Sequence, residues 1–320
     1  MKFMYRIALA LFAAVPLLAA AQGSYPNRPV KVIVSTVPGP LDAFARIICE
    51  KLSAALKQPF VVENKAGAGG NIAADFVKTQ PADGYTLLFS IDTTFTVNPP
   101  LYKNKLSFDP AKDFAAISVP VTYGQMLTVN PGVPAKTVKE LIALAKEKPL
   151  TYASGGNGSP SHLVAAYFLS TAGFEMTHIP YKGTGQSVID VLGGRVDALF
   201  AVTNGVLPYV KDNRLRALAV SSAKRSALAP EVPTIAELGY PGFDVSFAYA
   251  LMAPAGTPDD IVQLLSREVL KALAEPDVVE KNRMADYVAT GLDPRQSATW
   301  LRETRERWTK VITQAGITAE

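Results

Sequence analysis

Residues 30–62 read VKVIVSTVPGPLDAFARIICEKLSAALKQPFVV and contain the pattern of a strand, a helix and a second strand. Val30–Val34 is a short apolar run of the kind that forms a buried strand. Residues 42–57 carry apolar side chains three and four positions apart, which predicts an amphipathic helix, and residues 60–62 predict the next strand. A strand, a helix and a strand in succession are the unit of a parallel sheet that carries helices on its faces.

The same alternation continues along the chain and indicates an α/β fold with two lobes. Further strands are predicted at 86–89, 127–129, 151–153, 177–179, 198–202, 216–220 and 247–252, with helices between them. No flexible linker is present, so we expect the chain to cross between lobes within 118–129 and to return within 245–254. We predict that lobe 1 is formed by residues 22–121 plus 250–320 and lobe 2 by residues 122–249. A cleft between two such lobes suits the capture of a small molecule.

The N-terminal residues have the three parts of a secretory signal. Lys2 and Arg6 are basic, residues 7–20 are apolar, and residues 19–21 are three alanines that match a cleavage site. We therefore expect residues 1–21 to be a signal peptide and the mature, periplasmic chain to begin at Gln22. The alternative is a membrane anchor, but the apolar run is shorter than the roughly 20 residues of a spanning helix and contains Pro16.

Charge and cysteine content argue against several classes of protein. Without Lys2 and Arg6 the 32 basic residues become 30, against 28 acidic residues, and no basic run is present, so we expect no nucleic-acid partner. Cys49 is the only cysteine, which excludes an internal disulfide. A lipoprotein would need cysteine in place of Gln22, so we expect no lipid anchor.

Three loops each follow a predicted strand and precede a predicted helix. Loop 1 is residues 38–42 (PGPLD), loop 2 is residues 154–161 (SGGNGSPS) and loop 3 is residues 181–185 (YKGTG). Ligands of open α/β sheets bind beyond the carboxyl ends of the strands, where helix N-termini suit an anion. Glycine allows close backbone approach, and Ser and Thr add hydroxyl donors. One such loop could be an ordinary turn, whereas three loops across two lobes favour a carboxylate site.

A glycine-rich stretch after the second strand suggests a nucleotide site but does not fit one. Residues 67–72 read GAGGNI, and Asp92 follows about twenty residues later, as in a dinucleotide site. Ile72 occupies the third glycine position, however. We therefore interpret this stretch as structural packing.

Patterns typical of enzymes are weak. His162 and His178 are the two histidines, and they lack the HExxH spacing of a metal site. The chain contains no GxSxG motif of a serine hydrolase. A Ser159–His162 pair with Asp92 is an alternative, but roles in capping a helix are favoured for the first two residues.

A series of short motifs along the mature chain allows a more specific prediction. In order they are YPNRP (25–29), VVENK (61–65), GAGGNI (67–72), DGYTLL (83–88), DPAKDF (109–114), HIPYKG (178–183), LGGRVD (192–197), RALAV (216–220) and APAGTP (253–258). This series resembles the substrate-binding receptors of tripartite tricarboxylate transporters, also called Bug receptors. The resemblance implies a two-lobed type II periplasmic binding protein fold, in which two doubly wound sheets are joined by two crossing strands. It also implies capture of a small carboxylate by loops 1, 2 and 3 and its delivery to two membrane permease subunits.

Three departures from the family pattern concern the ligand. Loop 1 is one residue shorter than the usual PGGxxD and has Pro40 in place of the second glycine. Residues 200–202 read FAV where the family often has FDN. Asp92 stands where Ser or Asn is common, and two roles stay open for it: facing the ligand, where it would disfavour dianions and favour amine-bearing acids, or capping the turn formed by residues 93–94.

We predict a monomeric solute-binding receptor that is not an enzyme and uses no metal or organic cofactor. Its expected partners are a small carboxylate, or a related polar metabolite, and the membrane permease. A ligand sensor for a signalling partner and a Ser/His hydrolase are the alternatives. The predicted ligand-binding residues are Pro38, Gly39, Pro40, Leu41, Asp42, Asp92, Thr93, Ser154, Asn157, Gly158, Ser159, His162, Tyr181, Lys182, Gly183, Thr184 and Thr203.

Overall fold

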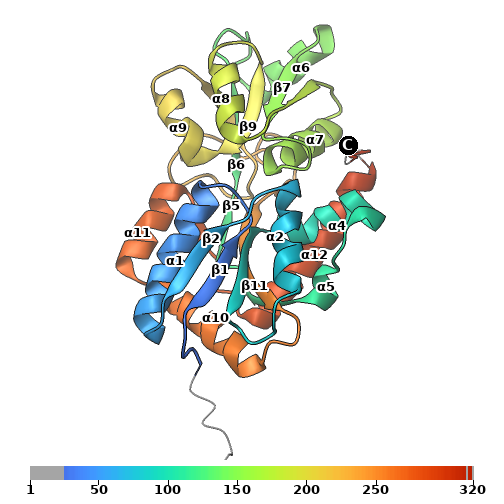
Figure 1. The fold of residues 1–320 in the computed structure, drawn as a ribbon. Coiled ribbons are helices and arrows are strands. Elements are labelled where there is room, and N and C mark those ends of the chain that lie inside the picture. The colour runs from blue at the N-terminus through green and yellow to red at the C-terminus, as the bar shows by residue number, and fades with distance from the viewer. Residues whose placement is uncertain (1–24, 315, 319–320) are drawn as a thin grey trace, which may run out of the picture.

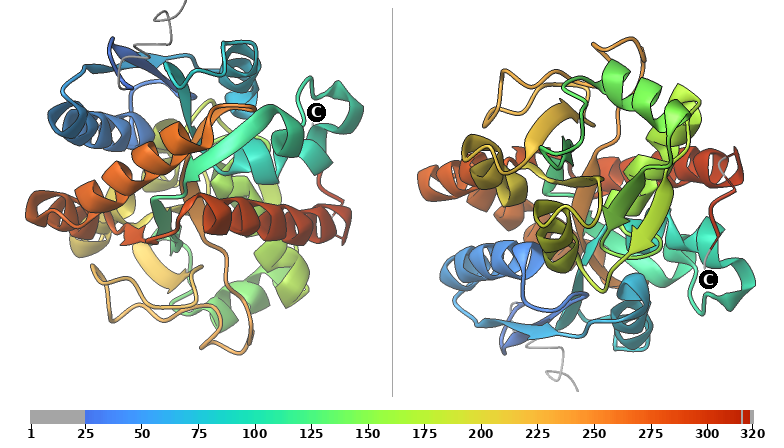
Figure 2. Two further views of the ribbon diagram at one scale, coloured as in Figure 1. Left: turned by 90° about the horizontal axis from the view of Figure 1, so that it is seen from below. Right: turned by 90° about the horizontal axis from the view of Figure 1, so that it is seen from above.

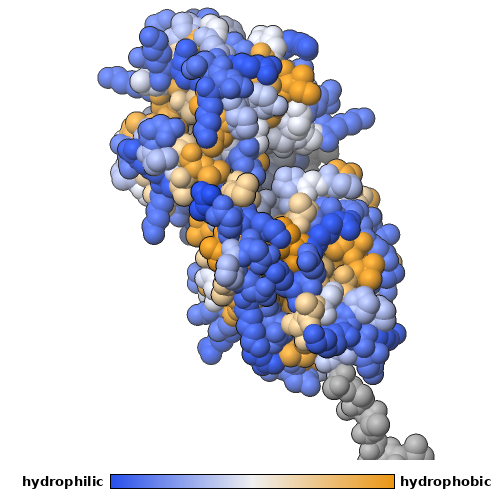
Figure 3. Space-filling model, turned by 90° about the vertical axis from the view of Figure 1, so that its left-hand side faces the viewer, coloured by the Kyte–Doolittle hydropathy of each residue, from blue (hydrophilic) through white to orange (hydrophobic). Residues whose placement is uncertain are grey.

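The chain folds into two lobes, which lie one above the other in Figure 1 and each contain one β-sheet with helices around it. The structure is a computed structural model that describes residues 25–314 and 316–318, so the predicted signal peptide lies outside the described residues. Figure 3 shows the constriction at which the two lobes meet. Within the described ranges, no helix has the length and apolar character needed to cross a membrane.

Lobe 1 is built on a seven-stranded sheet with the strand order β12-β5-β11-β3-β1-β2, and β4 pairs with β11 beside this path. β1 lies parallel to β2 and β3, which places Val32 beside Val62 and Leu87. The carboxyl ends of these three strands therefore lie at the same edge of the sheet, which faces lobe 2 in Figure 1. The strands are β1 (Val30–Val34), β2 (Phe60–Asn64), β3 (Thr86–Ile91), β4 (Phe114–Ser118), β5 (Val121–Tyr123), β11 (Phe247–Pro254) and β12 (Val288–Ala289).

Helices cover both faces of this sheet because its strands alternate their side chains between two apolar layers. Val32 packs into the layer that contains Phe44 of α1, whereas its neighbour Ile33 packs into the layer that contains Phe95 and Phe114. The helices of lobe 1 are α1 (Pro40–Leu56), α2 (Asn71–Lys78), α3 (Thr93–Thr96), α4 (Asn98–Tyr102), α5 (Pro110–Asp113), α10 (Asp259–Leu273), α11 (Pro276–Ala285) and α12 (Pro294–Gln314), with short 3-10 turns η1 (Ala68–Gly70) and η2 (Lys103–Lys105).

Lobe 2 is built on a five-stranded sheet with the strand order β10-β6-β9-β7-β8. β7 lies parallel to β8 and β9, whereas β6 runs antiparallel to β9 and β10. The strands are β6 (Gln125–Val129), β7 (Thr151–Ser154), β8 (Thr177–Pro180), β9 (Ala198–Val202) and β10 (Arg216–Val220), and the helices are α6 (Val138–Glu147), α7 (Pro160–Ala172), α8 (Thr184–Leu192) and α9 (Thr203–Lys211).

The chain passes between the lobes in two places. On the outward path only Gly124 separates β5, in the first sheet, from β6, in the second. On the return path the Val245 amide still bonds to the Ser221 carbonyl at 2.8 Å, while Phe247 already pairs with Tyr123 of the first sheet. The α/β architecture with two crossing segments is the predicted one, and the exact division of residues between lobes stays a prediction.

The expectation of parallel sheets is wrong in part, because both sheets are mixed. β11 runs antiparallel to β3, β4 and β5, and β6 runs antiparallel to both of its neighbours. The reason is topological: a chain that leaves one lobe and later returns to it must run through the junction in both directions. Helices are predicted from the sequence to start near residues 161, 185 and 205, and α7, α8 and α9 begin within one or two residues of these positions. The sequence analysis predicts no helix at α11.

The final helix, α12, extends across lobe 1, as the red ribbon in Figure 2 shows. Its last residue, Gln314, lines a cavity together with residues of α7 in lobe 2. α12 packs against β4, α3 and α4. Trp308 near its end stacks on Phe247 of the returning strand, with ring centroids 5.8 Å apart. The C-terminal part of α12 thereby lies next to the junction between the lobes.

Candidate ligand-binding site

Loop 1 is held against lobe 1 by a buried carboxylate. Asp42 accepts two hydrogen bonds from the Arg46 guanidinium, at 2.9 and 3.0 Å, and a third from the Asn64 amide at 2.9 Å. The same Asn64 amide donates to the Thr36 carbonyl at 2.9 Å, so it ties the start of the loop to its end. The hydrogen bond from Arg46 lowers the pKa of Asp42, which keeps the carboxyl ionised. The Asp42 carboxylate therefore helps to set the shape of loop 1. Ligand contact by residues 38–42 stays a prediction.

The other residues of loop 1 divide into an exposed group and a buried one. Pro38 and Pro40 are exposed and Gly39 is half-buried at the edge that faces lobe 2. Leu41 is only 3% exposed because its side chain enters the apolar core under α1. The Leu41 side chain therefore belongs to the core, and a ligand contact of Leu41 through its backbone stays a prediction.

Loop 2 is capped by its own hydroxyl groups. Ser159 precedes α7 and its Oγ accepts from the His162 amide at 3.4 Å, as expected of an N-cap residue. Ser161 Oγ accepts from the Gly155 amide at 2.9 Å and lies 3.1 Å from Ser159 Oγ. These bonds close the loop into a compact turn with Asn157 exposed at its tip.

Ser154 and His162 lie behind loop 2. Ser154 is fully buried, and its Oγ lies 2.6 Å from His178 Nε2 and accepts from the Gly156 amide at 3.1 Å. His162 Nδ1 accepts from the Gly158 amide at 3.1 Å. The Ser154 hydroxyl is thus bonded inside lobe 2, and ligand contact by Ser154 stays a prediction that concerns its backbone.

Loop 3 packs directly on loop 2. A Cβ atom at Gly155 would lie 3.0 Å from Thr184 Oγ1, and one at Gly156 would lie 2.9 Å from the Tyr181 carbonyl oxygen. The Tyr181 hydroxyl donates to Asp190 at 2.6 Å and so points into lobe 2. Thr184 and Lys182 are exposed and Gly183 is half-buried between them, so loop 3 presents one hydroxyl and one ammonium group to solvent.

The two lobes approach each other at loop 2. Gly158 has a φ of +71°, and a Cβ atom there would lie 2.9 Å from Leu101 Cδ2 of α4. Glycine is needed at this position both for the left-handed backbone and for the close approach. Loop 2 of lobe 2 therefore abuts lobe 1, on the side where loop 1 and the carboxyl ends of β1 and β3 lie.

Asp92, Thr93 and Thr203 are buried. Asp92 is 0% exposed, and its carboxylate accepts from the Ala248 amide at 2.9 Å and from Thr96 Oγ1 at 3.2 Å. Thr93 is 5% exposed and Thr203 is 2% exposed. Burial favours the structural role of the two left open for Asp92. Its carboxylate bonds to the returning strand β11 and to the Thr93 amide at the start of the turn at 93–94.

Burial dominates the electrostatics of Asp92. It raises the pKa of the carboxyl to about 7, against the lowering effects of the hydrogen bonds from Ala248 and Thr96 and of the charge on Arg307. Asp92 also lies far in sequence from its partner strand, so no local pattern reveals the bond.

The structure adds a hydroxyl chain that the sequence analysis missed. Ser90 Oγ lies 2.7 Å from Ser35 Oγ and 2.8 Å from Thr94 Oγ1, and Thr94 donates to the Gly69 carbonyl at 3.1 Å. These buried groups join the carboxyl ends of β1 and β3 to the glycine-rich stretch at 67–72. Gly70 has a φ of +93°, and a Cβ atom there would lie 2.3 Å from Thr94 Oγ1, which supports the structural interpretation of that stretch. The signal available in the sequence is the hydroxyl residue that follows or ends each strand.

Ser159, His162 and Asp92 are not arranged as the catalytic residues of a hydrolase. Ser159 Oγ bonds to a backbone amide, His162 Nδ1 bonds to the Gly158 amide, and Asp92 bonds to β11 in the other lobe. In the described ranges, no three His, Cys, Asp or Glu side chains gather to hold a metal ion.

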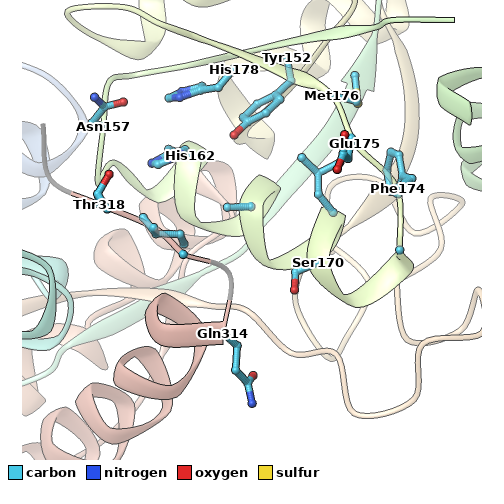
Figure 4. Close-up of a pocket in the computed structure, with 15 residues that line it drawn as sticks. Tyr152, Asn157, His162, Ser170, Phe174, Glu175, Met176, His178, Gln314 and Thr318 are labelled. Carbon is cyan, nitrogen blue, oxygen red and sulfur yellow. The ribbon is translucent and has the colours of Figure 1, made fainter.

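A cavity of about 680 Å³ opens beside loop 2, between α7 and the C-terminal residues (Figure 4). Of the predicted ligand-binding residues, only Asn157 and His162 line it. No residue of loop 1 or loop 3 lines this cavity.

Comparison with known proteins points to one family. Residues 44–317 match the family model described as tripartite tricarboxylate transporter family receptor. The chain is 35% identical over 313 residues to the protein BugT of Bordetella pertussis, covering 96% of each chain.

Solved structures show the same similarity in three dimensions. The R. palustris protein Rpa4515 with adipate superposes with a TM-score of 0.84 at 33% identity, covering 92% of this chain and 99% of the other. The periplasmic binding protein BugD gives 0.82 at 30% identity, covering 92% and 100%. MatC of Rhodopseudomonas palustris with bound malate gives 0.77 at 29% identity, covering 90% and 100%.

Proposed function

Because this chain belongs to the tripartite tricarboxylate transporter receptor family, we propose that it is a periplasmic solute-binding receptor that captures a small organic carboxylate between its lobes. The observation that carries the proposal is the placement of three loops. Loops 1, 2 and 3 follow the carboxyl ends of β1, β7 and β8 and lead into α1, α7 and α8. Backbone N–H groups at helix N-termini attract an anion, and here they come from both lobes.

Two relatives support the choice of a carboxylate. Adipate accompanies Rpa4515 and malate is bound to MatC. Both are small dicarboxylates, so a ligand of this class is the first to test. We propose further that residues 1–21 direct export, that the bound form docks on membrane permease subunits, and that the protein does not chemically change its ligand.

Some residues of the loops contact the ligand, and others hold the loops in position. Thr184 and Lys182 in loop 3 are exposed and supply a hydroxyl and a charge to the ligand. Asp42 holds loop 1 in place by its hydrogen bond with Arg46, and Tyr181 holds loop 3 in place by its hydrogen bond with Asp190. A carboxylate held mainly by N–H and O–H donors in a closing cleft needs no metal ion.

The proposal is tested first by identifying the ligand. Mass spectrometry of small molecules released from the purified, denatured protein should reveal a carboxylate, and calorimetry with adipate and malate should give saturable binding. Incubation with the bound compound should leave its mass unchanged. Absence of carboxylate binding would refute the receptor role, and conversion of the compound would support a hydrolase.

A second test concerns loop 3. Thr184→Val should raise the Kd about tenfold or more, because a hydrogen bond to a charged group contributes about 1.5–3 kcal/mol. Thr171→Val, at an exposed position near the end of α7, is the matched control and should leave the Kd unchanged. Equal affinities in the three proteins would remove Thr184 from the site.

A further inference from the structure

Three aromatic rings form a continuous stack behind loop 2. The His162 and His178 rings lie 4.2 Å apart between centroids and are almost parallel, with an interplanar angle of 5°. Tyr152 also stacks on His178, at 4.9 Å and 17°. Figure 4 shows the three side chains together at the start of α7, next to Asn157.

The fold brings these rings together from three elements. Tyr152 of β7 and His178 of β8 are partners in the parallel strand register. His162 lies in the first turn of α7, which begins immediately after loop 2. The strand before loop 2, the neighbouring strand and the helix after loop 2 therefore meet in one stack.

The stack is bonded to loop 2 at its start and near its end. His178 Nε2 shares a hydrogen bond with Ser154 Oγ at 2.6 Å, and that hydroxyl also accepts from the Gly156 amide at 3.1 Å. His162 Nδ1 accepts from the Gly158 amide at 3.1 Å. Gly156 and Gly158 have φ values of +117° and +71°, conformations that glycine adopts freely, so the loop needs such outside support to keep one shape.

We propose that His162 and His178 are positioning residues, which hold loop 2 in its ligand-binding shape from behind and do not contact the ligand. The inference rests on the proposed function in treating loop 2 as a binding loop. The sequence alone predicts that His162 contacts the ligand, whereas here His162 supports the loop that does. Holding Gly158 also fixes the point at which loop 2 meets Leu101 of lobe 1.

The charge state of the stack agrees with this role. Burial and the neighbouring His178 lower the pKa of His162 to about 4, so its ring is neutral at pH 7 and Nδ1 can accept a hydrogen bond. The titratable groups nearby are His178 on β8, Tyr152 on β7 and Glu175, which lines the same cavity.

The first test uses the unmodified protein and does not depend on any ligand. With only two histidines in the chain, the ring nitrogens can be resolved by NMR after ¹⁵N-histidine labelling. His162 should be the neutral tautomer with hydrogen on Nε2, and the Gly158 amide shift should follow its ionisation below about pH 5. Hydrogen on His162 Nδ1 at neutral pH would overturn the proposal.

The second test separates the two contributions of His162, the stacking of its ring and the hydrogen bond that Nδ1 accepts. His162→Phe keeps a stacking ring and loses the acceptor, whereas His162→Asn loses the ring and keeps an oxygen near the Nδ1 position. In the ligand-free protein, exchange of the Gly158 amide should become about tenfold faster in the Phe variant, as for loss of about 1.4 kcal/mol, and slower again in the Asn variant. Ser170→Ala, on the same helix and cavity, is the control and should exchange like wild type. Equal exchange in all four proteins would refute the role of His162.

The third test connects loop shape to binding, with adipate as the probe. The Kd of His162→Phe should rise about tenfold and that of His162→Asn by less, because loop 2 must then be ordered on binding. Faster exchange with an unchanged Kd would show that the stack does not serve ligand capture. If wild type binds neither adipate nor malate, the proposed ligand class fails, while the Gly158 exchange still decides what His162 does.

Discussion

Replacing Asp92 with asparagine should stabilise the protein, and the gain should grow as the pH rises from 5 to 8. Asp92 is fully buried and bonds to the Ala248 amide and to Thr96. An asparagine keeps an oxygen for the amide and a polar group for Thr96, but it never ionises. The variant therefore removes a buried negative charge and leaves the hydrogen-bond pattern largely in place.

The magnitude follows from the pKa of Asp92. Burial raises this pKa from 3.8 to about 7 in the folded protein. A folded-state pKa above the unfolded value means that stability is fully present below pH 4 and is lost as the pH rises to 7. At about 1.4 kcal/mol per pH unit the whole loss is of the order of 4 kcal/mol, of which about 3 kcal/mol falls between pH 5 and pH 8. The Asp92→Asn variant escapes this loss because its amide has no proton to release in this range.

The assay is urea unfolding of both proteins at pH 5, 6, 7 and 8 at constant ionic strength. The difference in free energy of unfolding between variant and wild type should rise with pH up to about 7 and then level off. His162 and all other titrating groups are common to both proteins, so their contributions cancel in the difference.

Asp42→Asn is the matched control. The hydrogen bond from Arg46 lowers the pKa of Asp42, so this carboxyl is ionised in both states from pH 5 to 8 and its replacement should shift stability by the same amount at each pH. A difference between Asp92→Asn and wild type that is equally independent of pH would refute the account of a buried carboxyl that ionises only near neutrality.

Other predictions concern separate parts of the molecule. Gly70→Ala should lower the free energy of unfolding by about 2–4 kcal/mol, because of its φ of +93° and the contact with Thr94, whereas Gly185→Ala, with open space around it, should be neutral or stabilising in urea unfolding. Acid should destabilise wild type as the pH falls from about 6.5 to 4, by up to about 3 kcal/mol, since the pKa of His162 is lowered to about 4; His162→Asn should lack this part of the acid sensitivity. Small-angle scattering should show a smaller radius of gyration when ligand binds between the lobes, and an unchanged radius would indicate a rigid cleft. Intact mass of the exported protein should correspond to a chain that begins at Gln22; a mass that retains Met1 or includes a lipid would contradict the predicted cleavage.

The sequence by itself predicted most of the longer strands and the helices between them, in their order, although it missed α11. The period of apolar residues predicts β1, α1 and β2, and Pro40 and Pro160 stand at the observed first residues of α1 and α7. The three glycine- and hydroxyl-containing loops could also be found, because each lies between a strand and a helix. These features depend on backbone geometry over a few neighbouring residues, which a local pattern records.

Only the tertiary structure decided which polar side chains are bonded to partners inside their own lobe. Asp92, Ser154 and Asp42 carry the right chemistry for ligand contact, but each is turned to a partner inside its lobe. The partner of Asp92 is the amide of Ala248, 156 residues away, and the stack of His162 on His178 depends on the pairing of β7 with β8. Whether a polar group is buried and bonded or exposed to ligand depends on packing between distant segments, and local periodicity carries no information about such contacts.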